Sequence, residues 1–409
     1  MLTADILSSP EYDQFVDSTL EDPFPFYAEL REAAPIHWSE QFDAWIITRY
    51  EDVVAAIKEK RFSSERGPAF FAQLPEDVQA EVKDLRDSLS TWFGWNDPPY
   101  QKRMRSLIGK AFTPGLVDGL RPRLEQITDE MLSEIEEQDE IDLIRDFAYI
   151  LPVKVIAELL GVPEKYHPIF KSSADHIVAF FAKSRALEEF ARKGQDAVAA
   201  MNEFLEIVVE EKRSNPEDDM ISLMIQAEVD GDKLTKEEII ANCEFFLTAG
   251  HTTTTDLIGN GTRAFIENPD QADRLRDDPS LVRTAVEEVL RYYSPVQRSW
   301  RVAKEDVSFR GIEVKKGQLV YPLIGSANRD PEQFEDPDKF DIGRQNNSHL
   351  AFGFGAHFCL GAPVARLEGE IVFRELLSRY PSMSIAPPGP TRRESLAIYS
   401  MESFPVRLQ

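Results

Sequence analysis

The sequence predicts a mainly α-helical fold with smaller β-sheets, of the α+β class, built as a single domain over residues 1–409. The region of about 98–295 is helix-rich, because nearly every segment in it repeats apolar residues at helical spacing. Parts rich in β-strand are expected at about 36–50, 300–324 and 385–409. The chain has no internal repeat, low-complexity tract or linker, so one large domain is expected rather than several.

The elements outside the helix-rich region are shorter. An Asp-Pro break precedes a helical run at 22–34, the strand-like runs IHWSE and AWIITR follow, and residues 51–60 are helical again. Residues 61–97 show no clean period and are expected to be irregular, which inside a compact chain usually means functional. Residues 306–324 alternate like a hairpin, whereas 327–349, rich in Asp, Pro and Asn, should form no regular element.

Composition and charge exclude several classes of protein. The N-terminus has neither the basic nor the apolar region of a signal peptide, and no apolar run approaches the ~20 residues of a membrane span, so we expect a cytoplasmic protein. The two cysteines, Cys243 and Cys359, are too few for a disulfide framework. A net charge of −26 repels polyanions, which argues against nucleic acid or an anionic membrane as a partner.

One long helix carries four consecutive threonines at its centre. The capping-box pattern TKEE begins the helix, and apolar spacing continues over residues 236–267, about 48 Å at 1.5 Å per residue. Its middle reads AGHTTTTD (249–256), where Gly250 and the threonines each weaken the helix. The pattern indicates either a packing kink, where another helix approaches closely, or a polar notch that faces a bulky group.

A second unusual stretch is HLAFGFGAHFCLGAPVAR (349–366), where glycines surround Cys359 just before a helix. Glycine lets the backbone fold tightly around the sulfur, and the nearby helix N-terminus favours a thiolate, which is a good ligand for a soft metal. The residues alone leave three alternatives: an inert buried cysteine, a nucleophile beside His357, or a zinc site with His349 and His357.

The same stretch carries a family resemblance. The residues Phe352, Gly355, His357, Cys359 and Gly361 match FxxGxHxCxG, the signature of cytochrome P450, and the chain resembles the soluble bacterial branch of this family over nearly its whole length. The resemblance implies the cytochrome P450 fold, with a long central helix over a buried haem b. It also implies that Cys359 is the axial thiolate of the haem iron.

Further motifs agree with the resemblance. Glu288 and Arg291 match the family's ExxR pair, and at i,i+3 on a helix they share a face. Arg344 matches the basic residue that completes this buried ion-pair network.

The resemblance also assigns cofactor contacts. Arginines suit the two haem propionates, and the expected cofactor-binding residues besides Cys359 are Arg105, Arg301, His357, Gln101, Ala249, Gly250, Phe352 and Gly361. Relatives often carry histidine where Gln101 stands, so that contact becomes a neutral amide or disappears.

The threonine stretch departs from the family pattern AGx(D/E)T. Thr253 falls on the family's threonine, which hydrogen-bonds during oxygen activation, but Thr252 stands at the acidic position. A threonine can relay a proton through water but cannot supply one as an acid. Asp256, four residues beyond Thr252, is a candidate to replace the acid, although a structural role competes with this interpretation.

The function implied is monooxygenation of a hydrophobic small organic substrate by hydroxylation, epoxidation or dealkylation. One atom of O2 is inserted, a ferredoxin with an NAD(P)H reductase supplies the electrons, and the enzyme is a monomer. Because Thr252 replaces the acid, a peroxide-driven peroxygenase and a nitric-oxide-reductase-type enzyme are the alternatives, and a non-catalytic haem sensor is a weaker one. Lys102, Arg103, Lys110 and Arg366 are candidates for a basic face that docks an acidic ferredoxin.

Segments that line the substrate pocket in relatives are mostly aromatic or aliphatic in this chain, which predicts a hydrophobic substrate. No set of residues for binding a carboxylate stands out, although Arg298 is a candidate. The predicted pocket residues are Trp92, Phe93, Trp95, Phe180, Phe181, Phe245, Phe246, Thr248, Val296, Gln297, Tyr399 and Met401.

Overall fold

The computed structural model describes residues 21–40, 42–65, 67–72, 74–182, 187–393, 395 and 397–408. Helices dominate the chain, and several small β-sheets accompany them. The helices are α2 (Phe24–Ala33), α3 (Tyr50–Lys58), α4 (Gly67–Phe71), α5 (Glu76–Glu81), α6 (Lys83–Thr91), α7 (Tyr100–Ala111), α8 (Pro114–Ile135), α9 (Ile150–Leu160), α10 (His167–Ala182), α11 (Leu187–Ser214), α12 (Met220–Gln226), α13 (Lys236–Glu267), α14 (Pro269–Asp277), α15 (Val282–Tyr292), α16 (Ile324–Ala327) and α17 (Ala362–Arg379).

The strands are short and lie mostly near the two ends of the chain and after α15. They are β1 (Ile36–Ser39), β2 (Ala44–Ile47), β3 (Phe62–Ser63), β4 (Glu140–Asp142), β5 (Glu228–Val229), β6 (Asp232–Lys233), β7 (Arg301–Ala303), β8 (Val307–Phe309), β9 (Ile312–Val314), β10 (Leu319–Pro322), β11 (Ser384–Ile385), β12 (Thr391–Arg392), β13 (Met401–Ser403) and β14 (Pro405–Arg407).

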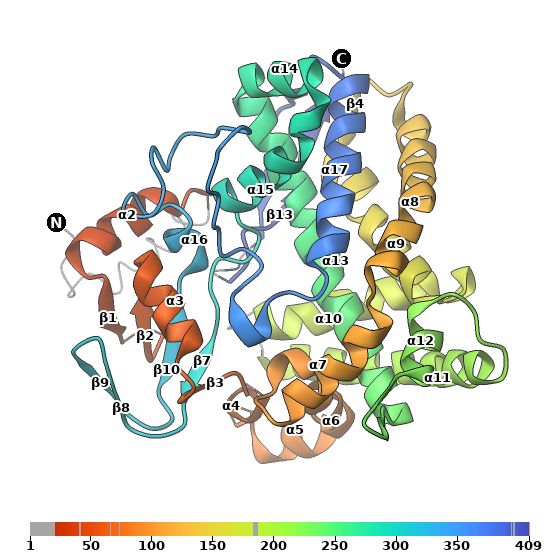
Figure 1. Ribbon diagram of the computed structural model, residues 1–409, viewed down its shortest axis with the longest axis vertical. Coiled ribbons are helices and arrows are strands. Elements are labelled where there is room, and N and C mark those ends of the chain that lie inside the picture. Colours follow the sequence, from red (N-terminus) through yellow and green to blue (C-terminus); the bar gives the residue numbers. More distant parts are fainter. Residues whose placement is uncertain are drawn as a thin grey trace.

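Helix α13 runs through the middle of the molecule, with α9 and α17 beside it (Figure 1). It begins with a complete capping box, in which the Glu238 amide donates to Thr235 Oγ1 at 3.2 Å and the Thr235 amide donates to Glu238 Oε2 at 3.0 Å. The helix bounds agree with those predicted from the sequence. Most of its side chains are buried, because α9, α10, α11, α15 and α17 all pack against it.

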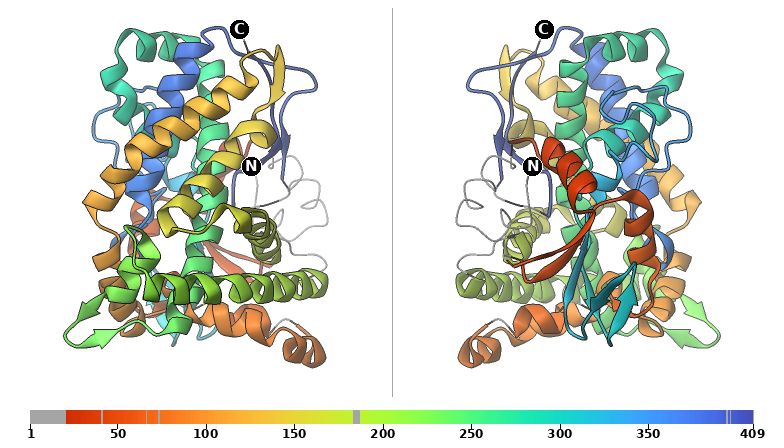
Figure 2. Two further views of the ribbon diagram at one scale, coloured as in Figure 1. Left: turned by 90° about the vertical axis from the view of Figure 1, so that its right-hand side faces the viewer. Right: turned by 90° about the vertical axis from the view of Figure 1, so that its left-hand side faces the viewer.

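The largest sheet lies on one side of the helical body (Figure 2). Its strand order is β1-β2-β10-β7-β3, with β10 parallel to β2 and the other described pairs antiparallel. The register places Trp38 opposite Trp45, and Tyr321 opposite Ile46. Strand β7, which lies between β10 and β3, begins at Arg301.

Residues 61–97 were expected to be irregular, and this prediction is wrong. They hold α4, α5, α6 and the 3-10 turn η1 (Phe93–Trp95). The helices are short, and Pro75 and Val82 cap their ends, so no period extends far enough to be recognised in the sequence. In α6 the buried side chains are Leu85, Ser88 and Leu89, at helical spacing.

No helix in the described part of the chain is long and apolar enough to cross a membrane.

Candidate active site

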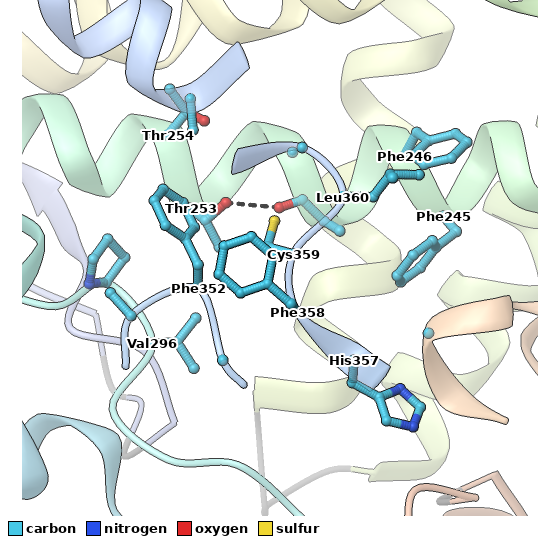
Figure 3. Close-up of a pocket in the computed structure, with 18 of the residues that line it drawn as sticks. Phe245, Phe246, Thr253, Thr254, Val296, Phe352, His357, Phe358, Cys359 and Leu360 are labelled. Carbon is cyan, nitrogen blue, oxygen red and sulfur yellow. Dashed lines mark hydrogen bonds between the residues drawn. The ribbon is translucent and has the colours of Figure 1, made fainter. Parts of the chain in front are cut away.

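A cavity of about 380 Å³ lies between the middle of α13 and the loop that carries Cys359. In Figure 3, Thr253 on α13 and Cys359 on the loop face the same space, with Phe352 and Phe358 beside the sulfur. The Cys359 side chain is solvent-accessible even though protein atoms surround it densely, because it lies in the wall of this cavity. The sequence elements identified separately, the threonine stretch and the cysteine loop, therefore meet at one site.

The cysteine loop is held by its own backbone. The Cys359 amide donates to the Phe352 carbonyl at 2.8 Å, and Gly353 and Gly355 take φ values of 72° and 69° that other residues rarely adopt. Burial raises the pKa of the Cys359 thiol, while the backbone amides of Gly361 and Ala362 oppose this rise. Coordination to a metal ion deprotonates such a thiol, so these amides are placed to stabilise a thiolate ligand.

Glu288, Arg291 and Arg344 come together in a buried network. Glu288 and Arg291 are 0% exposed, and Arg291 donates from Nε to Glu288 Oε2 at 2.8 Å and from Nη2 to Oε1 at 2.9 Å. Arg344 Nε lies 3.1 Å from both Glu288 oxygens. Arg291 also donates to the carbonyls of Asn328 and Pro337. The network thus anchors the irregular segment 328–349, which precedes the cysteine loop.

The arginines expected to contact the cofactor differ in position. Arg301 is buried in the cavity wall, where Nη1 donates to Ser299 Oγ at 2.9 Å and to the Trp300 carbonyl at 2.7 Å. Burial lowers the pKa of Arg301 to about 10, so it remains charged at neutral pH. Arg105 is half-buried and does not line the cavity, although its charge acts on Cys359.

His357, Ala249, Gly250, Phe352 and Gly361 all line the cavity. A Cβ added to Gly250 would lie 2.7 Å from Ile156 Cδ1 of α9, so this glycine also allows the close helix approach that the sequence left as an alternative.

Gln101 is hydrogen-bonded within the protein. Its neutral amide was expected either to contact the cofactor or to lose that contact. The side chain is buried, and its Nε2 donates to the Ala356 carbonyl at 2.8 Å, which ties α7 to the cysteine loop.

The four threonines point to different surroundings. Thr253 is half-buried, lines the cavity and donates to the Ala249 carbonyl at 2.7 Å. Thr252 lines a second cavity of about 200 Å³, which Thr253 also borders. Thr254 lines the main cavity, and Thr255 donates to the His251 carbonyl at 3.1 Å. The hydroxyls of Thr253 and Thr255 thus donate to carbonyls of α13 itself, while Thr252 and Thr254 line different cavities.

Asp256 does not reach either cavity. Its Oδ1 accepts a hydrogen bond from Ser400 Oγ at 2.7 Å, and its Oδ2 has no hydrogen-bond partner. Burial raises the pKa of Asp256 to about 7. The carboxyl faces the C-terminal segment instead of the threonines, so the expectation that Asp256 replaces the missing acid is not supported.

Glu368 on α17 is an acidic residue of the cavity that the sequence interpretation missed. It is fully buried and lines the main cavity, and its Oε2 has no hydrogen-bond partner. Burial raises the pKa of Glu368 to about 8, and hydrogen bonding from Thr254 opposes this rise. The signal was present, because Glu368 falls inside the apolar helical stripe formed by Val364, Leu367 and Ile371.

The predicted substrate-pocket residues divide into two groups. Phe93, Trp95, Phe245, Phe246 and Val296 line the main cavity, and Trp92 and Thr248 line the second one.

The other predicted pocket residues, Phe180, Gln297, Tyr399 and Met401, line neither cavity. Phe180 packs on Phe71, and Gln297 Nε2 donates to the Ser294 carbonyl at 2.6 Å. The Arg392 guanidinium lies 3.6 Å from the centre of the Tyr399 ring. Met401 is buried in β13. These are corrections, and each side chain is used for packing or internal hydrogen bonding. The Phe181 side chain lies outside the described residues.

Two of the four basic residues suggested for a docking face are paired within the chain. Arg103 binds Asp232 and Glu238, and Arg366 binds both oxygens of Glu287 at 2.7 and 2.9 Å. Lys102 and Lys110 are exposed on α7.

The fold and this site define a haem-thiolate oxidoreductase, and comparisons with known proteins identify the family. The cytochrome P450 family model matches residues 43–388. The chain is 39% identical to cytochrome P450 107B1 of Saccharopolyspora erythraea over 409 residues, covering 97% of this chain and 98% of the relative. It is 38% identical to the 6-deoxyerythronolide B hydroxylase of the same organism over 401 residues, covering 96% and 97%.

A solved structure shows the same similarity in three dimensions. The chain superposes with a TM-score of 0.88 and 33% identity on P450BioI in complex with an acyl carrier protein ligated to hexadec-9Z-enoic acid, covering 96% of this chain and 100% of that one. This protein belongs to the cytochrome P450 family and is a monooxygenase-class oxidoreductase with a haem cofactor. The predicted α+β cytochrome P450 fold is confirmed.

The residues of the cavity fit a haem. Cys359 offers a soft sulfur ligand from one wall, Ala249 and Gly250 leave room on the opposite wall, and the rest of the lining is largely apolar, with several aromatic side chains. Arg301 supplies a buried cation for an anionic side chain of the cofactor. When bound, a haem with a thiolate ligand supplies the oxygen-activating redox chemistry of the family.

Proposed function

We propose that this enzyme inserts one atom of O2 into a hydrophobic small organic molecule, with electrons passed from NAD(P)H through a reductase and a ferredoxin. The observation that carries the proposal is that Thr253 and Cys359 face one cavity whose other walls are largely apolar side chains, several of them aromatic. The similarity to a relative named as a hydroxylase supports it. We also propose that the chain is one domain, because the larger of its two hydrophobic clusters contains residues from Phe24 to Leu408, and the smaller one lies around the largest sheet.

The site residues have distinct roles in this proposal. Cys359 holds the iron of a haem b, and Arg301, Arg105 and His357 bind its propionates. Thr253 lines the cavity that Cys359 also lines, and its hydroxyl orders water or oxygen there by hydrogen bonding. Phe245 and Phe246 exclude bulk water from the reacting carbon.

Because Thr252 stands at the usual acidic position of α13, this helix supplies no acid there. Glu368 of α17 is a buried carboxyl in the cavity lining and can take the role of proton donor. Because its pKa is raised to about 8, Glu368 carries its proton at neutral pH, and it interacts with the side chain of Thr254 in the middle of α13. We infer that Glu368 holds a proton that Thr254 passes into the cavity. In this route the proton starts from α17 and not from an acid on α13.

The absence of an acid at position 252 also favours a second candidate function, in which hydrogen peroxide or nitric oxide replaces oxygen and the ferredoxin. The test compares product formation from NADH and O2, with a surrogate ferredoxin and reductase, against turnover with hydrogen peroxide or nitric oxide alone. Coupled consumption of NADH and O2 with formation of an oxygenated product supports monooxygenation. Turnover confined to peroxide or nitric oxide contradicts it.

A further inference from the structure

The second cavity borders the haem site along the middle of α13. Phe245, Ala249, Thr253 and Val296 line both cavities. The second cavity has a volume of about 200 Å³, and most of its described lining is apolar. A molecule held in the space beside Cys359 therefore extends past Thr253 into a second apolar compartment.

The threonines of α13 use their hydroxyls in different ways. Thr254 interacts with the carboxyl of Glu368. Thr252 forms no side-chain hydrogen bond with any residue in the described part of the chain. Four others donate to the carbonyl four residues earlier in the helix at 2.7 to 3.1 Å, namely Thr248, Thr253, Thr255 and Thr262.

The unused hydroxyl of Thr252 faces the second cavity. The side chain is 9% exposed, its oxygen keeps some accessible surface, and the space beside it is this cavity. When a purely apolar molecule displaces water from the cavity, the hydroxyl loses its hydrogen bond to water, and this loss opposes binding. A molecule that places an acceptor oxygen at the same point restores the hydrogen bond.

Other polar side chains of the second cavity contact the protein itself. Ser395 Oγ accepts the amides of Ala397 and Ile398 at 3.3 and 3.2 Å, which closes a turn. Thr252 thus offers a hydrogen-bond donor that no described residue takes up. The guanidinium of Arg298 packs among aromatic rings, with its central carbon 4.7 to 5.3 Å from the ring centres of Phe42, Trp300 and Tyr321.

The place of Thr252 on the helix relates this donor to the reacting centre. Thr252 precedes Thr253, and successive helical residues differ by about 100° in direction and about 1.5 Å in height. Thr253 borders both cavities, whereas Thr252 borders the second one. An oxygen bound at Thr252 therefore lies beyond Thr253 as seen from Cys359, and the rest of the molecule extends toward the sulfur.

We propose that Thr252 donates a hydrogen bond to an acceptor oxygen of the substrate, so that the natural substrate is an apolar molecule with a carbonyl or hydroxyl oxygen distant from the oxidised carbon. The hydroxyl at position 252 then orients the substrate where the family pattern has an acid. This inference rests on the proposed function, because it names the substrate class of the same site.

The test uses the haem-loaded enzyme and isothermal titration calorimetry. The probes are matched pairs of a ketone and the compound with a methylene group in its place, with the carbonyl at different positions of linear, aryl and polycyclic skeletons. Thr252→Val keeps the shape of the side chain without its hydroxyl. It should weaken the binding of at least one ketone about five-fold, the value of one neutral hydrogen bond, and change its methylene partner less than about two-fold. Thr252→Ser should retain the wild-type affinity for that ketone.

A matched control is Thr262→Val, because Thr262 is a buried threonine of the same helix that donates to the Ile258 carbonyl and lines neither cavity. This substitution should change neither affinity. The proposal is overturned if Thr252→Val weakens no ketone more than its methylene partner. It is also overturned if Thr252→Val lowers the product formed per NADH and leaves every ketone affinity unchanged, because the hydroxyl would then serve proton transfer.

Oxidation of the bound ketone with NADH and redox partners is measured separately in the wild-type enzyme. A ketone affinity that depends on Thr252, without any oxygenated product, would contradict the proposed function and leave the role of Thr252 intact. Oxygenated products from probes whose affinities are unaffected by Thr252→Val would support the proposed function and overturn the role of Thr252.

Discussion

Replacing Glu368 with glutamine should separate hydrogen bonding from proton transfer in the cavity. Burial raises the pKa of Glu368 to about 8. A carboxyl with this pKa is about 90% protonated at pH 7 and about 10% protonated at pH 9, because each pH unit changes the ratio ten-fold. In the wild-type enzyme, the product formed per NADH should therefore decrease as the pH rises through about 8.

Glutamine keeps the shape and the hydrogen bonds of the neutral acid but has no proton to transfer. Glu368→Gln should lower the product formed per NADH at pH 7 by roughly 10²-fold, the lower end for general acid catalysis, and remove the pH dependence near 8. The assay measures NADH, O2 and product across this pH range with a surrogate ferredoxin and reductase.

Glu370→Gln is the matched control, because Glu370 lies on the same helix but pairs with Arg121 and Arg283 outside the cavity. Wild-type yield and pH profile in Glu368→Gln, or the same loss in Glu370→Gln, would refute the assigned role.

Three further predictions concern residues of α13 and α15. Thr253→Ala should lower the product formed per NADH and O2 consumed, whereas Thr253→Ser, which keeps a hydroxyl, should retain the wild-type yield. The same product yield per NADH in the two variants would contradict the role of the hydroxyl. Burial raises the pKa of Glu244 from 4.5 to about 8, so wild type loses stability as pH rises between these values, by about 5 kcal/mol in all. Urea titrations at several pH values should show that Glu244→Gln loses less stability than wild type as the pH rises. The same dependence of stability on pH in both proteins would count against this. Glu288→Gln leaves Arg291 buried beside a neutral group and should cost about 3–5 kcal/mol in thermal or urea unfolding; a cost below about 1 kcal/mol would show that the pair contributes little.

The sequence predicts those features that depend on local chemistry. A capping box and apolar spacing are properties of a few consecutive residues, so the bounds of α13 could be read directly. The glycines around Cys359 and the i,i+3 spacing of Glu288 and Arg291 are local in the same sense. In contrast, α4, α5 and α6 are each too short to show a period. Their burial depends on tertiary contacts: α11 packs on α5 and α6, α13 packs on α6, and α4 packs on α6.

The candidate acids show the limit of local patterns most clearly. Asp256 and Glu368 are both carboxyls on helices that pass the cavity, and spacing alone favoured Asp256. Only the packing shows that Asp256 meets Ser400, while Glu368 faces the cavity.

The sequence by itself identified a cysteine loop and a weakened helix, because both motifs are encoded in short contiguous runs, and the resemblance to the cytochrome P450 family implied that they belong to one haem site. Only the tertiary structure decided which threonine faces which space. Successive residues on a helix point about 100° apart, so four adjacent threonines meet different neighbours. Thr252 borders the second cavity, Thr254 borders the main one, and Thr253 borders both, because α9, α17 and the cysteine loop occupy different sides of α13.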